Sequence, residues 1–265
     1  MNDYERTQYQ QIEEWKAQEP SIVKKTIDFA MKPVLCVSEK IIPPKLIEGA
    51  LKGANGIART LADEKDIMRD GNVGNISELA TKELQLSDKL ANNVHNWAIG
   101  LAATEGGICG YLGLPGMFVD VPAIITFALR TIHKIGLCYG YKFETPEDTQ
   151  FVLNIMSLAG ANTMQEKNTA LLTLKSLQVI LKRLTWKKMA EKAAQNATSK
   201  EGFLLAIKAL AKQLGINLTK RKTLQIISVI GAGVGTIMNG DFINDIAWAA
   251  RRCCQERWLI ENGKI

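Results

Sequence analysis

Histidine and paired cysteines are scarce in this chain, and their scarcity excludes several kinds of site. The 265 residues include two histidines and five cysteines. No two cysteines have CxxC spacing, and neither His95 nor His133 has a second ligand at metal-binding spacing nearby. We therefore expect no metal site and no disulfide framework. An odd number of free thiols is typical of a reducing cytoplasm.

Common enzyme signatures are also missing, and we expect no secretory leader. The motifs HExxH and GxSxG do not occur. The first residues, MNDYERTQYQQIEEWKAQEP, are polar and acidic, and they lack the basic start and apolar run of a secretory signal. From these observations we expect a cytoplasmic protein.

The segment 226–236, IISVIGAGVGT, resembles a dinucleotide-binding turn only in part. The fingerprint requires a third glycine where this chain has Thr236, and the 29 residues that follow are too few for a second strand with its ribose-binding acid. Aromatic residues make up 6% of the chain and are not interleaved with basic ones. We expect no cofactor and no nucleic-acid partner.

What the chain does have is two apolar stretches rich in glycine, at 97–141 and 224–241. Each glycine inside a helix costs about 1 kcal/mol relative to alanine, so these clusters indicate close packing of backbones. Glycines four residues apart share one helix face and favour a helix–helix contact. Such pairs are Gly106 and Gly110 in the first stretch, and Gly231 and Gly235 in the second.

The first stretch is predicted to form a glycine-rich helical hairpin over 98–141. Residues 98–129 contain just two charges, Glu105 and Asp120. Glycine and proline at 113–116 and Pro122 are expected to break the run, leaving pieces shorter than the ~20 apolar residues that cross a bilayer. We favour a buried hairpin packed on the 224–237 helix. A hairpin that dips into a membrane interface is the alternative.

Helical periodicity recurs elsewhere, whereas strand-like alternation is scarce. An amphipathic helix is predicted over 170–189, because apolar residues repeat there at three- and four-residue spacing. The members of this stripe are Ala170, Leu174, Leu177, Leu181 and Leu184. A second such helix is predicted over 242–260.

Boundary residues divide the chain further. Thr145 and Pro146 have the pattern of a helix start. Thr198 is predicted to cap a helix over 199–214 that Gly215 ends, and Thr219 to cap the next. Asn239–Asp241 is predicted to separate the last two helices. The sequence thus predicts an all-α fold of about eight to ten helices, with 71–265 as one domain and 1–70 as a helical extension packed on it.

Charge is distributed unevenly. Residues 167–240 carry thirteen Lys and Arg against two acids, a net of +11; since the whole chain is +6, the remainder is −5. Such asymmetry points to an anionic membrane surface or an acidic partner. A lysine-rich solvated face is the alternative. The candidate binding residues are Lys175, Lys182, Arg183, Lys187, Lys188, Lys220, Arg221 and Lys222.

Asp120, Arg130 and His133 are the candidates for a hidden hydrolase site, because they are polar groups in an apolar segment. By helical rise, Asp120 and Arg130 lie about 15 Å apart and do not pair directly. The favoured interpretation is a buried polar network that fixes the hairpin, since charges in such a segment need partners.

Residues 113–160 and 229–262 resemble the EcsC family, bacterial proteins named for a component encoded with an ABC transporter. The resemblance rests on the Leu-Pro-Gly turn at 114–116, Tyr139-Gly140-Tyr141 and Arg257-Trp258-Leu259. Further matches are Asp120-Val121-Pro122, Leu129-Arg130 and Asn239. It implies an all-helical bacterial domain associated with membrane transport or secretion.

The expected function is that of a non-enzymatic, membrane-associated accessory protein in the cytoplasm. It would bind anionic lipid or a membrane protein such as an ABC transporter. The sequence leaves the oligomeric state open. A hydrolase with a site around Asp120, Arg130 and His133, and a purely soluble helical scaffold, are the alternatives.

Overall fold

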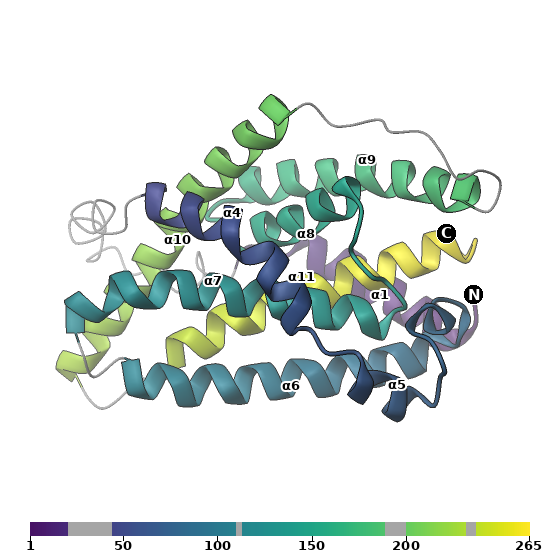
Figure 1. Ribbon diagram of the computed structural model, residues 1–265, viewed down its shortest axis with the longest axis horizontal. Coiled ribbons are helices and arrows are strands. Elements are labelled where there is room, and N and C mark those ends of the chain that lie inside the picture. The colour runs from purple at the N-terminus through teal and green to yellow at the C-terminus, as the bar shows by residue number, and fades with distance from the viewer. Residues whose placement is uncertain (21–43, 110–112, 189–199, 232–236) are drawn as a thin grey trace.

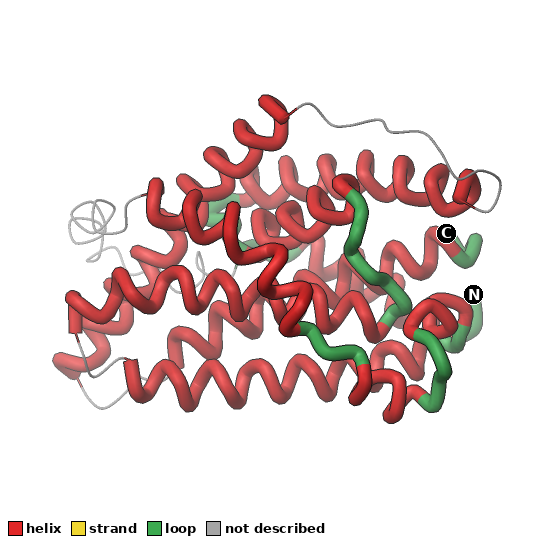
Figure 2. Tube along the Cα trace, in the orientation of Figure 1, coloured by secondary structure: helices red, strands yellow, loops and turns green. Residues whose placement is uncertain are grey.

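The computed structural model describes residues 1–20, 44–109, 113–188, 200–231 and 237–265. These ranges form nine α-helices and one 3₁₀-helix and contain no strand, which confirms the all-α prediction (Figures 1 and 2). In chain order they are α1 (Asp3–Ala17), α4 (Pro44–Leu61), α5 (Lys65–Gly71), η2 (Ile76–Thr81), α6 (Leu84–Cys109), α7 (Gly113–Cys138), α8 (Pro146–Ala159), α9 (Met164–Lys188), α10 (Lys200–Gly231) and α11 (Ile237–Glu261).

Helices α6 and α7 form the predicted hairpin and lie side by side in Figure 1. Helix α11 packs against both of them, and α4 packs along α7. Small residues at these contacts, among them Ala98, Ala128 and Ala250, are fully buried and allow the helix axes to approach closely. Large apolar side chains such as Ile125 and Phe242 complete the core.

The predicted break at Pro122 is wrong, because α7 continues from Gly113 to Cys138 through this proline. A proline inside a helix removes one backbone hydrogen bond and costs about 3 kcal/mol. Val121 and Ile125 beside it are buried, and that packing offsets the cost. Pro115 and Gly116 lie in the first turn of α7, where backbone N–H groups have no helical partner in any case.

One stretch of α7, Val121–Cys138, is the only segment in the described ranges that is long and apolar enough to cross a membrane by length and composition. Of this stretch, 67% is buried inside the protein, as in the core helix of a helical bundle. Its main neighbours are α4, α6 and α11.

Local chemistry places two other helices as predicted. Thr145 caps α8: its hydroxyl accepts from the Asp148 N–H at 3.1 Å, and Pro146 occupies the first turn. On α9, the inner stripe of Ala170, Leu174, Leu177 and Leu181 is buried against the core, while the Leu184 side chain lies outside the described part.

Three predicted helix boundaries in the last third of the chain are wrong. Helix α10 runs through Gly215 and Thr219, both of which are buried, because the flanking Leu214 and Leu218 pack into the core. Helix propensity is a weak preference that such packing overrides. Asn239–Asp241 lies inside α11 rather than between helices. The predicted cap Thr198 is outside the described residues.

The described parts of the first 70 residues, 1–20 and 44–70, share the core of residues 71–265. Ile12 of α1 and Ile47 and Leu51 of α4 belong to the same buried apolar cluster as the hairpin. The predicted glycine contacts fall where side-chain surroundings are not described: Gly106 and Gly231 lie within α6 and α10, and Gly110 and Gly235 lie outside the described residues.

Candidate functional site

Arg130 and His133, the candidates for a hydrolase site, have different surroundings. Arg130 is half-exposed, its Nε donates to the Leu61 carbonyl at 3.0 Å, and its guanidinium lies 4.8 Å from the Trp97 ring centroid. His133 is buried, with its ring 5.7 Å from that of Phe143. Burial and the positive charge of Arg59 lower the pKa of His133 to about 4, so its ring is neutral at pH 7. The Asp120 side chain lies outside the described part of α7.

A buried polar network centres instead on Asp88 of α6. The Tyr4 and Tyr139 hydroxyls each donate to its carboxylate at 2.6 Å, and the Gln255 amide donates at 2.7 Å. Hydrogen bonds to a buried carboxylate strengthen as the surrounding dielectric falls. Asp88 thereby connects α1, the α6–α7 hairpin and α11.

Arg257 is the second buried charge that connects helices. Its guanidinium bonds Asp148 at 3.1 Å and Glu261 at 2.8 Å and lies 4.1 Å from the centre of the Tyr141 ring. These partners tie α11 to the start of α8 and to the segment after α7. The arrangement compensates a buried charge and is structural.

The predicted basic surface divides into three groups. Lys175 is exposed, and Lys182 and Lys220 are half-exposed. Arg221 is 3% exposed and bonds Asp245 at 2.6 Å, so its inclusion in an exposed basic surface is wrong. The reason is a partner 24 residues away that helical periodicity does not reveal. The side chains of Arg183, Lys187, Lys188 and Lys222 are not described.

The outward face of α9 is unusual because it carries a single charge. Between Asn168 and Ile180 the exposed residues include one charge, Lys175. The other exposed residues after Asn168 are Thr169, Leu172, Thr173, Ser176, Val179 and Ile180. Leu172 is 68% exposed and Val179 48% exposed, whereas an outer helix face normally carries charged and strongly polar side chains.

The hydroxyl groups on this face are turned back into the helix. Thr169 donates to the Gln165 carbonyl at 2.9 Å, Thr173 to the Thr169 carbonyl at 2.9 Å and Ser176 to the Leu172 carbonyl at 3.1 Å. A hydroxyl that already donates a hydrogen bond to a carbonyl of its own helix loses fewer hydrogen bonds when water is removed. The α9 outer face, defined as Thr169, Leu172, Thr173, Ser176, Val179 and Ile180, therefore behaves as a largely apolar surface.

An apolar groove of about 930 Å³ runs beside this face, between α9, α1 and the end of α11. Its apolar residues are Leu171, Leu172, Val179, Ile260 and Ile265. Lys175 and Lys182 line it from α9, two turns apart on one side. On the α1 side, Lys16 is neutralised by Glu13 at 2.7 Å and Glu256 at 2.5 Å.

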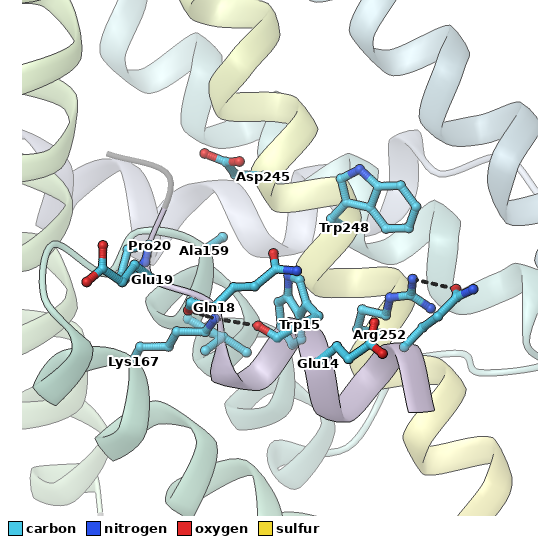
Figure 3. A pocket seen from close by; sticks show the side chains of 12 residues that line it. Glu14, Trp15, Gln18, Glu19, Pro20, Ala159, Lys167, Asp245, Trp248 and Arg252 are labelled. Carbon is cyan, nitrogen blue, oxygen red and sulfur yellow. Dashed lines mark hydrogen bonds between the residues drawn. The ribbon is translucent and has the colours of Figure 1, made fainter. Parts of the chain in front are cut away.

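A smaller, polar pocket of about 350 Å³ lies on the other side of α1 (Figure 3). Helix α11 contributes Asp245, Trp248 and Arg252 to it, and α1 contributes Gln11, Trp15 and Gln18, among others. Lys167 of α9 donates from its ammonium to the Trp15 and Gln18 carbonyls, both at 2.6 Å, and caps the end of α1. Within the described residues, no cluster of three His, Cys, Asp or Glu suits a metal ion.

The model of the EcsC protein family matches residues 6–259. The chain belongs to the EcsC family. It is also 21% identical over 189 residues to the uncharacterized protein YdbA of Bacillus subtilis (strain 168), a match that covers 71% of this chain and 64% of that protein. No solved structure matches it significantly.

The EcsC-family match includes α1, which the sequence patterns assigned to an extension. The residues that sequence reasoning missed are Asp88, Arg251 and Arg252, all buried on α6 and α11. One signal for the polar pocket was present: Asp245, Trp248 and Arg252 follow i, i+3, i+7 spacing and so share a face of α11. In this EcsC-family protein the two recesses beside α1, the polar pocket and the apolar groove, are the candidate functional sites.

Proposed function

We propose that this protein binds peripherally to an anionic membrane, with the α9 outer face against the lipid. The observation that supports this most directly is the uncharged outer face with its back-bonded hydroxyls. In water such a face is unfavourable, whereas at a headgroup boundary it gains roughly 25 cal/mol for each Å² of apolar surface buried.

Lys175 and Lys182 supply the electrostatic part of the binding. Both line the apolar groove next to the α9 outer face, so their ammonium groups lie at the level where headgroup phosphates meet buried side chains. Each basic residue near an anionic leaflet contributes about 1 kcal/mol. Arg183, Lys187 and Lys188 continue the same helix and raise the local positive charge.

The apolar groove enlarges the apolar surface that would contact the lipid. Ile265 is 40% exposed and, with Ile260, extends the apolar area from α9 to the C-terminal end of α11. A helical protein held in this way at the cytoplasmic side of a membrane suits the accessory role in transport or secretion that the family resemblance implied.

Flotation of the purified protein with liposomes tests the proposal. We expect binding to vesicles that contain anionic lipid, weaker binding to neutral vesicles, and partial release by high salt, because the charged contribution is screened and the apolar one is not. A Leu172→Ser, Val179→Ser variant should float poorly. Its control is Leu205→Ser on α10, where the leucine is equally exposed at 67%.

Two results would contradict the proposal. One is the absence of flotation with any vesicle composition. The other is an equal loss of flotation in the α9 variant and in the Leu205→Ser control, since that would mean that exposed apolar residues act without regard to position.

A further inference from the structure

The polar pocket is built around a buried arginine that has no ion-pair partner among the described residues. Arg252 is 8% exposed. Its Nη1 donates to the amide oxygens of Gln255 at 2.9 Å and Gln8 at 3.1 Å, and its Nη2 donates to Gln11 at 3.0 Å. Figure 3 shows Arg252 on the pocket wall beneath Trp248. A buried guanidinium is normally bonded directly to a carboxylate. Here its direct partners are neutral amides, and the Asp88 carboxylate, which accepts a hydrogen bond from Gln255, acts on it from a longer distance.

The hydrogen bonds of Arg252 use three of its five N–H donors. Nε is buried and has no partner. A buried donor without a partner costs about 1–3 kcal/mol. Nε–H and one Nη2–H form one edge of the planar guanidinium, which is the edge that a carboxylate or phosphate engages with two parallel hydrogen bonds.

The charges around the pocket favour an anion at this edge. Lys167 places a second buried cation on the opposite wall, and Arg251 lies on the same Trp248 ring as Arg252, 4.5 Å from its centroid. Asp245, which also lines the pocket, is bonded to Arg221. Glu14 and Glu19 also line the pocket, but both are exposed, so water screens their charge.

We propose that the polar pocket binds a small organic anion, a carboxylate or a phosphate monoester, through the Nε–Nη2 edge of Arg252. Trp15 and Trp248 form the apolar walls, so a ligand whose anionic group is attached to a ring or a short apolar chain fits best. The volume of about 350 Å³ is at the small end of the range for ligand pockets and limits the ligand to a compact molecule. This proposal is independent of membrane binding, which uses the other side of α1.

The test observes the Arg252 Nε–H itself in the full-length, ¹⁵N-labelled protein. The probes are benzoate and phenyl phosphate, with benzyl alcohol and benzylammonium as neutral and cationic controls. We expect the two anions to shift the Arg252 Nε–H resonance saturably, with a dissociation constant of about 1 mM or tighter, and the controls not to do so. Absence of a saturable shift with both anions would overturn the proposal.

Arg251 offers a matched control. It is equally buried at 8%, lies on the same Trp248 ring and bonds Asn92 and His95 rather than lining the pocket. Arg252→Lys keeps the charge but loses the two-donor edge, so it should weaken binding of phenyl phosphate at least tenfold. Arg251→Lys should change it less than twofold. Equal losses in the two variants would contradict the assignment.

A variant on the other wall keeps the proposal testable if Arg252→Lys does not fold. Trp15 is half-buried, and Trp15→Leu removes an aromatic wall without touching Arg252. It should weaken binding of phenyl phosphate more than binding of inorganic phosphate. A Trp15→Leu variant that binds phenyl phosphate as well as the unmodified protein would exclude the pocket as the site.

Discussion

The polar pocket and the apolar groove lie on opposite sides of α1 and differ in almost every physical property. The pocket is about 350 Å³ and contains two tryptophans and two buried cations, whereas the groove is about 930 Å³ and is mainly apolar with lysines at its edge. One helix supplies both, because Gln11, Trp15 and Gln18 face the pocket while Tyr9, Glu13 and Lys16 face the groove.

This difference suits the two recesses to different kinds of ligand. The groove and the α9 outer face offer area and diffuse charge, which suit an extended lipid surface. The pocket offers one directed donor edge, which suits a single compact anion. Both depend on the position of α1, which is held by the buried Ile12 and by polar contacts: Tyr4 to Asp88, Gln8 and Gln11 to Arg252, and Lys16 to Glu256.

Replacing Asp88 by Asn should have the largest effect, because it disturbs the seating of α1 and so both recesses. The amide keeps one acceptor oxygen and replaces the other with an NH₂ donor, so either the Tyr4 hydroxyl or the Tyr139 hydroxyl together with the Gln255 amide loses its acceptor. We expect the free energy of unfolding to fall by about 2–4 kcal/mol in denaturant titrations. Asp3→Asn, at a fully exposed side chain, is the control and should change it by less than about 0.5 kcal/mol.

Acid should weaken the core around His133. Since the pKa of His133 falls from 6.5 in the unfolded chain to about 4 in the folded one, the unfolded chain binds more protons between these values. The free energy of unfolding should therefore decrease as pH drops from 6.5 to 4, by up to about 3 kcal/mol from this group. A His133→Gln variant should have a shallower slope over the same window, and an unchanged slope would show that other groups cause it.

Negative charges introduced on the α9 outer face should weaken membrane binding without affecting the polar pocket. Leu172→Asp with Val179→Asp is expected to lower the vesicle partition coefficient tenfold to a hundredfold, because two apolar contacts are lost and two negative charges face anionic lipid. The anion affinity of the polar pocket should stay within twofold. Loss of both activities would mean that the two recesses are not separate.

Reversing the charge of one lysine should have the smallest effect on membrane binding. Lys182→Glu is expected to weaken binding to anionic vesicles several-fold at low salt and to have little effect at high salt. Lys89→Glu, on an exposed position of α6, is the matched control and should leave vesicle binding nearly unchanged. A salt-independent loss for Lys182→Glu would contradict an electrostatic role.

The parts of the fold that depend on local chemistry could be predicted from the sequence. The Thr145 cap and the inner stripe of α9 follow from side chains three and four residues apart. The continuity of α7 through Pro122 and of α10 through Gly215 could not, because tertiary packing offsets a local cost. Only the assembled fold supplies that packing.

The candidate sites, like the fold, could be predicted from the sequence only in part. Lys175 and Lys182 were identified from charge, but the burial of Arg221 depends on Asp245, which lies in another helix. The α9 outer face was visible in principle, since Asn168–Ile180 contains a single charge. Its character as a surface depends on the fold, which places Leu172 and Val179 on the outside, opposite the inner stripe.

The central claim, that the α9 outer face enters the headgroup boundary, is tested most directly by a fluorescent label at position 179. Val179→Cys carries an environment-sensitive dye in a Cys36→Ser, Cys109→Ser background, since Cys138, Cys253 and Cys254 are buried. With anionic vesicles we predict a blue shift and quenching by nitroxide lipids at position 179, and neither change for a label at Leu205→Cys on α10. Unchanged fluorescence at 179, or equal changes at both positions, would contradict the account.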